Sequence, residues 1–302
     1  MPQRTLIGVV FIALCALAAG FFQANRSDAG LPDELRLGVL PNVNRDSINQ
    51  RYDALITYLS DELEVPCRLV PANSYEQLVE FFHNGDVDLA YLGGATLIQV
   101  LDRDNGVPLV SRDVDAMFSS FYLIRQDSGI DSFAELEGKT FSFGSKLSTS
   151  GHYMPRIFME QDNIVPEDFF GDITYSGAHD ATALAVQHGK VFAGVASAEI
   201  VEEMLEDGRL DDSAIQVIRE SRPYVNYAWT IQPNFDEETR KRISRAFLDL
   251  LPSDEEHAAV LDEARADYFV PAIVEQYTSG EEYRAIRELM AAADLEDTQS
   301  PW

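Results

Sequence analysis

Apolar residues recur along this chain at two spacings, and segments with the two spacings alternate from residue 35 onward. Residues 35–41 alternate apolar and polar side chains, as a strand does, whereas residues 52–63 place apolar side chains every three or four positions, as a helix does. The same patterns predict further strands at 66–70, 86–92, 108–110, 118–125, 140–144, 173–175, 191–195, 215–218 and 227–231, and further helices after 74 and at 93–101, 153–159, 181–187 and 199–205. After Pro233 the pattern is helical to about residue 295, with breaks at Pro252 and Pro271. Strands that alternate with helices predict an α/β fold with a largely parallel sheet.

Three loops follow predicted strands, and their composition suits a binding site. They are the loop at Pro41, the turn at Gly93 and Gly94, and the polar stretch that begins at Ser148. In open α/β sheets, ligands bind beyond the carboxyl ends of the strands. The three loops are therefore expected to meet at one cleft.

The stretch Ser148-Thr149-Ser150-Gly151-His152 lies between a predicted strand and a predicted helix. Backbone N–H groups at a helix N-terminus lack partners within the helix and favour an anion, and three hydroxyl groups add further donors. A simpler interpretation is that Ser148 or Thr149 only caps the helix. The spacing alone leaves both interpretations open.

Composition narrows the partners that the chain can have. The 302 residues are 46% hydrophobic, enough for a large core in two domains or lobes, but 51 acidic residues outnumber 23 basic ones and give a net charge of −28. Such a charge argues against nucleic acid and anionic membrane surfaces as partners. An anion site in this protein has to depend on local dipoles and hydrogen bonds.

The first 25 residues predict export. Arg4 precedes an almost unbroken apolar segment at 5–22, which indicates a signal peptide or an uncleaved signal anchor. Cys15 lies in that segment, so Cys67 has no partner for a disulfide in a mature chain. Five histidines and no cysteine cluster make a metal site improbable.

Four segments in order carry a resemblance to a known family: 37–41, 87–91, 148–152 and 176–180. From about residue 35 to 295 the chain resembles the phosphate/phosphite/phosphonate-binding proteins of ABC importers, in the type II periplasmic-binding-protein superfamily. The resemblance implies two α/β lobes, each a mixed, largely parallel sheet flanked by helices, joined by two hinge crossings. Lobe one would comprise 30–120 plus 228–302, and lobe two 121–227.

The resemblance also implies which residues bind the ligand. Ser148, Thr149 and Ser150 match the loop that binds the phosphonyl oxygens in the family, and Tyr75 and His179 match further binding residues. From the residues themselves, His179 is equally well explained as a satisfied histidine near a helix start, and Tyr75 as a half-buried core tyrosine.

Three more positions concern what is attached to the phosphorus. Glu199 matches an acidic position that engages the ammonium group of aminoethylphosphonate in the family, although a glutamate in a first helical turn is also ordinary. Asn226 stands where the family has a second acidic residue, and Phe118 where it has a tyrosine. Tyr91 completes the expected ligand-binding set. The departures at Asn226 and Phe118 weaken the case for an aminoalkyl ligand and leave the oxyanion part of the site intact.

The expected function is a periplasmic or otherwise extracytoplasmic binding protein that closes its lobes on phosphonate, phosphite or phosphate and delivers it to an ABC permease in the inner membrane. The alternative is a membrane-anchored sensory module of the same fold. An enzyme is disfavoured because Asp180 is adjacent to His179 and poorly placed to orient it, and because no nucleophile elbow, zinc-protease motif or Walker loop is present. We expect a monomer without cofactor, metal or nucleic-acid partner.

Overall fold

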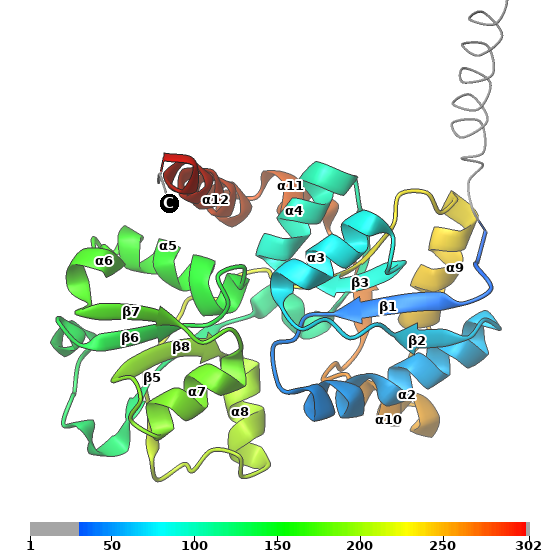
Figure 1. Cartoon of the computed structure of the whole chain (residues 1–302). Helices are drawn as coiled ribbons and strands as arrows, with labels where there is room; N and C mark the ends of the chain where they lie inside the picture. Colours follow the sequence, from blue (N-terminus) through cyan, green and yellow to red (C-terminus); the bar gives the residue numbers. More distant parts are fainter. Residues whose placement is uncertain (1–29, 300–302) are drawn as a thin grey trace, which may run out of the picture.

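The computed structural model describes residues 30–299, and their side chains up to residue 293. Two separate sheets organise this part of the chain (Figure 1). The first has the order β11-β4-β10-β3-β1-β2 and the second β7-β6-β8-β5-β9. We call the first sheet with its helices lobe one and the second with its helices lobe two. The strands are β1 (Leu35–Val39), β2 (Cys67–Leu69), β3 (Leu89–Leu92), β4 (Val107–Arg112), β10 (Ala228–Ile231) and β11 (Phe269–Pro271) in lobe one, and β5 (Ser120–Arg125), β6 (Thr140–Phe143), β7 (Asp172–Tyr175), β8 (Ala193–Ser197) and β9 (Ile215–Glu220) in lobe two.

Helices flank both sheets, and one of them contacts both lobes. Lobe one carries α2 (Arg45–Leu63), α3 (Tyr75–Asn84), α4 (Gly94–Asp104), α9 (Glu237–Leu248), α10 (Glu255–Glu263), α11 (Val274–Ser279) and α12 (Glu281–Gln299); lobe two carries α5 (Met154–Gln161), α6 (Pro166–Phe169), α7 (His179–Gln187) and α8 (Ala198–Glu206). Short 3₁₀ segments are η1 (Asp113–Met117), η2 (Gln126–Ser128) and η3 (Phe133–Leu136), and η4 (Thr149–Tyr153) is a π-type turn. The C-terminal helix α12 packs on α4 of lobe one and on α5 of lobe two. Among the helices of residues 30–299, none is both long and apolar enough to cross a membrane, and the predicted export segment lies outside these residues.

The predicted α/β class and the mixed sheets are confirmed, but the sheets are less parallel than expected. Parallel pairing joins β1 to β2 and β3, and β6 to β7 and β8, whereas the other five pairings are antiparallel. Strands that enter a lobe by crossing from the other one, β5 and β10, pair antiparallel with their neighbours.

Two local predictions were wrong. Helix α2 begins at Arg45, inside the expected polar loop, because the Asn44 side chain accepts a hydrogen bond from Ser47 N (3.1 Å) and caps the helix there. Residues 269–271 form the edge strand β11 within the region expected to be helical, and Pro271 stands at its end, where a missing N–H costs least.

The chain crosses between the lobes twice, and the two crossings pair with each other. Phe118 N donates to Tyr224 O (3.0 Å) and Tyr224 N donates to Phe118 O (2.9 Å), just before β5 and just after β9. The expected boundaries near 120 and 228 fall at these crossings. The division of the chain at these boundaries remains a prediction, because the boundaries of two lobes are defined by how the lobes move.

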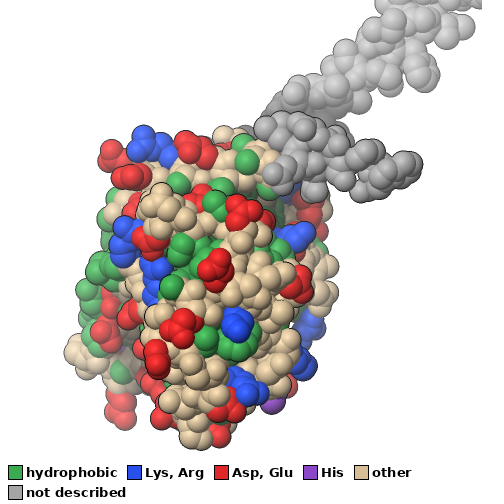
Figure 2. All heavy atoms as spheres, turned by 90° about the vertical axis from the view of Figure 1, so that its left-hand side faces the viewer, with side chains coloured by type: hydrophobic (Ala, Val, Ile, Leu, Met, Phe, Trp, Pro, Cys, Tyr) green, Lys and Arg blue, Asp and Glu red, His purple; other side chains and the backbone are tan. Residues whose placement is uncertain are grey.

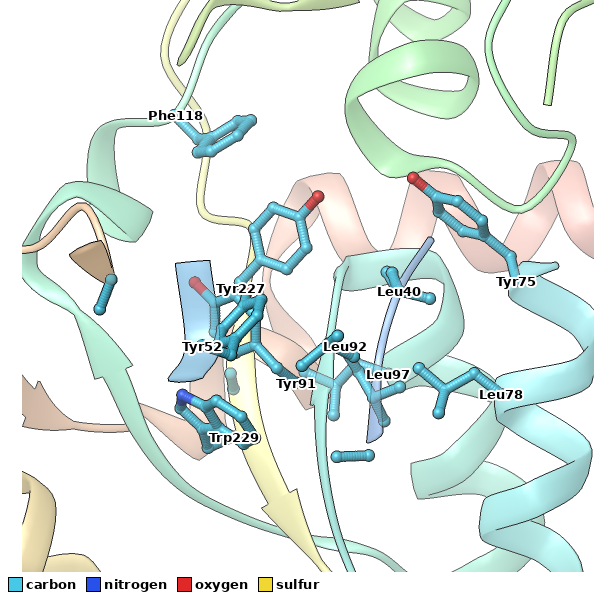
Figure 3. Close-up of a cluster of buried hydrophobic side chains, with 14 of the residues drawn as sticks. Leu40, Tyr52, Tyr75, Leu78, Tyr91, Leu92, Leu97, Phe118, Tyr227 and Trp229 are labelled. Atoms are coloured by element: carbon cyan, nitrogen blue, oxygen red, sulfur yellow. The ribbon is translucent and has the colours of Figure 1, made fainter. Parts of the chain in front are cut away.

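A stack of aromatic side chains lies where lobe one meets the crossings (Figure 3). The Tyr91 ring stacks on Tyr227 (centroids 4.9 Å apart, 18° between planes) and packs on Trp229 at 5.0 Å. Phe118 covers Tyr227 from the first crossing, with centroids 5.4 Å apart. The apolar core of lobe one therefore continues into the hinge.

A buried ion cluster fixes the start of the first crossing. Arg112, at the end of β4, donates from its backbone N to Asp115 Oδ2 (2.9 Å) and from Nη2 to Asp115 Oδ1 (2.9 Å), and Tyr91 donates its hydroxyl to the same carboxylate (2.6 Å). The other side of the Arg112 guanidinium holds both oxygens of Glu199 from lobe two, at 2.7 and 2.9 Å. Breaking a buried pair leaves a charge without compensation and is strongly destabilising.

We therefore expect Asp115→Asn to lower the free energy of unfolding by about 3 kcal/mol in chemical denaturation. Glu237→Gln is the matched control, because it removes an acidic partner from an exposed pair with Lys241 and should leave the denaturation midpoint unchanged. Equal midpoints for the two variants would show that the cluster contributes little to stability.

Candidate functional site

The Ser148–Ser150 hydroxyls lie at the start of the turn η4, which continues directly into α5. Ser148 is the N-cap of this turn: its Oγ accepts a hydrogen bond from Gly151 N (2.9 Å). Ser148 therefore does cap the turn, because its oxygen accepts a hydrogen bond from the backbone. The hydroxyl hydrogen remains to be donated elsewhere, so capping and anion binding are compatible.

Thr149 joins the two lobes. Its Oγ1 accepts a hydrogen bond from Ala95 N (2.8 Å), in the first turn of α4. The N-cap of α4 is Gly93, which has no side chain to cap with, and the N–H of Gly94 donates instead to Asn226 Oδ1 (3.1 Å). The start of α4 is thus capped by a residue of lobe two and a residue of the second crossing.

His179 begins α7, and its neighbours fix its tautomer. Ser197 N donates to His179 Nδ1 (3.1 Å), so in the neutral ring the hydrogen sits on Nε2 and is donated to Ser150 Oγ (3.1 Å). Burial lowers the pKa of His179 to about 4, against a smaller opposite effect of Glu199. At neutral pH this histidine is a neutral donor and cannot take a proton from Ser150.

The three hydroxyl groups share one arrangement. Ser148, Thr149 and Ser150 each accept a hydrogen bond from a nitrogen donor, and each hydroxyl keeps its own hydrogen to donate. All three side chains, like His179, are at most 3% exposed. Buried hydroxyls that already accept one hydrogen bond and keep a hydrogen to donate are suited to an oxyanion, which only accepts.

Two predicted site residues carry polar atoms that lack partners. Within the described part of the chain, Tyr75 Oη and Asn226 Nδ2 are two of three buried side-chain polar atoms without a hydrogen bond. Burial raises the pKa of Tyr75 far above its usual value, and the Ser148 hydroxyl, which lies close to Tyr75 Oη but outside hydrogen-bond geometry, offsets this only in part. Figure 3 shows the hydroxyls of Tyr75 and Tyr227 facing the same gap. An unpaired buried donor costs stability, so these atoms need an explanation.

Sequence reasoning missed residues of the crossings that support the site. Ser120 donates its hydroxyl to Ser150 O (2.8 Å), so the contact between Ser120 Oγ and Tyr224 Oη (2.6 Å) has the tyrosine as donor. Tyr227 was missed as well, although it follows Asn226 directly. The only available signal was an aromatic and hydroxyl-rich composition at the crossings, which does not distinguish a site from a core.

Three expected binding residues are engaged with the protein itself. Tyr91 donates to Asp115, and Phe118 packs on Tyr224 and Tyr227. Burial would raise the pKa of Glu199, but the charge and hydrogen bonds of Arg112 outweigh it and lower the pKa to about 2. A carboxylate so firmly held by Arg112 is poorly available to an ammonium group, and the ligand-binding roles of Glu199, Tyr91 and Phe118 stay predictions.

Asp180 does not orient His179. Its Oδ2 accepts a hydrogen bond from Asn44 N (2.8 Å), and His179 N donates to Asn42 O (3.0 Å). Both bonds join the start of α7 in lobe two to the loop after β1 in lobe one. With the Thr149–Ala95 bond they hold the lobes together around the site.

A cleft of about 390 Å³ leads from the surface to Tyr75. Lobe one contributes Pro41, Ser74, Tyr75 and Glu76, and lobe two contributes Ser145, Lys146, Tyr175 and Ser176 among its lining residues. Of the predicted site residues, only Tyr75 is among the lining residues of this cleft. Within residues 30–299, no group of three or more histidine, cysteine or acidic side chains is placed to hold a metal ion.

Comparison with known proteins gives the same class of molecule. A probable ABC transporter phosphite binding protein, PhnD1, of Prochlorococcus marinus strain MIT 9301 is 29% identical over 263 residues, 83% of this chain and 89% of that protein. The phosphate-import protein PhnD of Mycolicibacterium smegmatis is 28% identical over 205 residues, 64% of each chain. The structure of P. marinus PhnD1 in complex with methylphosphonate superposes with a TM-score of 0.79 at 28% identity and covers 86% of this chain and 99% of that one.

The periplasmic substrate-binding proteins of phosphonate ABC transporters match residues 37–277, more than three quarters of the chain. The superposition also confirms the two-lobed periplasmic-binding-protein fold. The chain therefore belongs to the family of periplasmic phosphonate-binding proteins of ABC transporters.

Proposed function

We propose that this protein binds a small phosphorus oxyanion (a phosphonate, phosphite or phosphate) between its lobes and delivers it to an ABC importer. The oxyanion would lie among Ser148, Thr149, Ser150, Tyr75 and Asn226, where the start of η4 meets the start of α4. Relatives named for phosphite and phosphate, and one solved with methylphosphonate, support this ligand class.

The observation that carries the proposal is the pair of unpaired donors, Tyr75 Oη and Asn226 Nδ2. Native proteins rarely leave buried donors unsatisfied, and each such atom costs about 1–3 kcal/mol. An oxyanion beside the three hydroxyls would accept from both atoms. The nearby first turns of α4 and α7 add favourable dipoles for a negative charge.

The mechanism that we propose is lobe closure. The site residues are too buried for a ligand to reach them in this arrangement, so the lobes have to open for it to enter. The bonds between Thr149 and Ala95, and between Asp180 and Asn44, would break on opening and re-form on closing. Donors from both lobes would then surround the anion and exclude water.

Members of this family are solute-binding proteins, and the family acts outside the cytoplasm. We propose that this chain also binds without chemistry, because His179 donates to Ser150 and is not its base. A monomer that docks on an inner-membrane permease, with no nucleic-acid partner, fits this role. The end of the protein that faces away from lobe one shows acidic and basic side chains interspersed, with no broad basic patch (Figure 2).

A sensory role would depend on residues 5–22, and N-terminal sequencing of the exported protein would separate an anchored sensor from a released carrier.

The function is tested by calorimetric titration with phosphite, methylphosphonate, phosphate and aminoethylphosphonate, on the wild type and on Tyr75→Phe. We expect at least one of these ligands to bind the wild type and Tyr75→Phe to weaken it about tenfold or more, through loss of a charge-assisted hydrogen bond. Because the hydroxyl has no partner without ligand, the thermal midpoint of the unliganded variant should be equal to or above that of the wild type.

Tyr58→Phe is the matched control, since the Tyr58 hydroxyl donates to Ala246 O (2.8 Å) in lobe one, away from the site residues. It should lower stability slightly and leave affinity unchanged. If Tyr75→Phe binds as tightly as the wild type, Tyr75 is a core tyrosine and the site is misplaced.

Asn226→Asp separates capping from ligand binding. The aspartate keeps the oxygen that accepts from Gly94 N but replaces the unpaired Nδ2 donor by a negative oxygen. We expect a loss of oxyanion affinity of about 100-fold or more, because a lost donor and like-charge repulsion each cost on the order of 1.5–3 kcal/mol. Circular dichroism would establish that the variant is folded, and unchanged affinity would mean that Asn226 serves α4 alone.

The pKa of His179 predicts a specific acid sensitivity. With a pKa of about 4 in the folded protein and an ordinary value of 6.5, the unfolded state binds a proton that the folded state does not. Stability from this group is complete above pH 6.5 and is lost as the pH falls to about 4, by roughly 3 kcal/mol at about 1.4 kcal/mol per pKa unit.

Unfolding free energies of the wild type and His179→Gln, measured from pH 7 to 4, should therefore converge as the pH falls. His152, whose pKa burial also lowers to about 4, is present in both proteins and cancels in the difference. Two parallel profiles would refute a buried neutral His179.

A further inference from the structure

The proposed site contains no cation, although the whole protein is strongly acidic. Its donors are hydroxyls and the Asn226 amide, and the His179 ring that donates to Ser150 is neutral. Two buried arginines, Arg112 at the end of β4 and Arg51 in α2, are already paired with acidic side chains. With a net charge of −28, the protein as a whole repels an approaching oxyanion. The rate of capture then depends on the charges at the entrance.

The entrance cleft carries a lysine on its lobe-two side. Lys146 lines the cleft two residues before Ser148, and Tyr75 lines it from lobe one while its hydroxyl belongs to the site. The chain has four lysines, at positions 139, 146, 190 and 241, and of these only Lys146 lines the cleft. A basic side chain is thus placed on the path that leads to the oxyanion donors.

Lys146 is held in place by its neighbours. Its carbonyl accepts a hydrogen bond from His152 Nδ1 (2.8 Å), and the other ring nitrogen of His152 contacts Tyr175 Oη at 3.2 Å. The ammonium lies 5.6 Å from the centre of the Tyr175 ring, within the range of a cation–π contact. The loop and the side chain are therefore both attached to β7.

The charge of Lys146 is not neutralised by an ion pair within the described residues. Its neighbour Arg156 is paired with Glu167 at 2.7 Å, so that arginine contributes little net charge. Glu76, in the first turn of α3, faces the same cleft from lobe one. Lys146 offsets this carboxylate, and without Lys146 the cleft would be net negative.

We propose that Lys146 recruits the oxyanion into the cleft and sets its association rate, without holding the ligand in the closed site. This inference rests on the proposed function. The closed site satisfies the anion with neutral donors, so the lysine acts during approach, when an exposed charge at the mouth steers a ligand of opposite sign. Its effect depends on ionic strength, because the Debye length falls from about 30 Å at 0.01 M salt to about 3 Å at 1 M.

Stopped-flow fluorescence with the best-binding ligand of the calorimetric panel tests the proposal on the full exported chain. Trp229 packs on the Tyr91–Tyr227 stack beside the site and is a natural reporter. The proteins are the wild type, Lys146→Gln, Lys146→Arg and Lys190→Gln. The last removes the same charge from the end of α7, away from the cleft lining.

At low salt, we expect the association rate constant of Lys146→Gln to fall about fivefold relative to Lys190→Gln, with an unchanged dissociation rate constant. Lys146→Arg should retain the wild-type rate, and the difference should disappear near 1 M salt. Equal association rates in the two Gln variants would overturn the proposal, as would an effect confined to dissociation, which would make Lys146 a holding residue. If the wild type binds none of the panel, the proposed function itself fails, whereas wild-type binding with an unaffected Lys146→Gln refutes only this inference.

Discussion

The architecture of the site depends on a helix that cannot cap itself. Helix α4 starts at Gly94 after the N-cap Gly93, and neither residue has a side chain that could cap it; a Cβ on Gly94 would lie 2.7 Å from Tyr283 Oη. Its first N–H groups are buried and must find acceptors, and they find them in Asn226 and Thr149. One requirement of backbone hydrogen bonding thereby brings together α4, the second crossing and lobe two. In the proposed site, the donors that remain on those residues would serve the ligand.

Hydrogen bonds within the protein also explain why the site residues are neutral. Each hydroxyl of the Ser148–Ser150 loop uses an acceptor position on a protein N–H, and His179 uses its acceptor nitrogen on Ser197. What is left is a set of neutral donors with fixed directions. Neutral donors carry less desolvation cost into a closed site than a lysine or arginine would, and they gain strength when the acceptor is charged. An acidic protein can therefore bind an anion without burying a cation beside it.

The sequence predicted those parts of the site and the fold that depend on a few adjacent residues. The cap at Ser74, the start of α4 after Gly93 and the hydroxyl loop after β6 all follow from a few adjacent residues. The edge strand β11 was missed because only its pairing with β4 makes those three residues a strand. Glu199 and Asp180 could not be understood from sequence for a similar reason. Their partners, Arg112 and Asn44, lie 87 and 136 positions away and meet them only across the contact between the lobes.

The proposed site presents hydroxyl and amide donors but no free carboxylate, which bears on the protonation state of what it would hold. The acceptor atoms of Asn226 and His179 are occupied by N–H groups, and Asp115 and Glu199 are occupied by Arg112. A ligand that carries a P–OH group would bring a hydrogen that needs an acceptor, and a buried donor without a partner is penalised. A fully ionised oxyanion brings only acceptors and matches the donors that the protein presents. The proposed site would thus select by hydrogen-bond direction, a criterion that depends on pH through the ligand and hardly on the protein, whose His179 stays neutral until about pH 4.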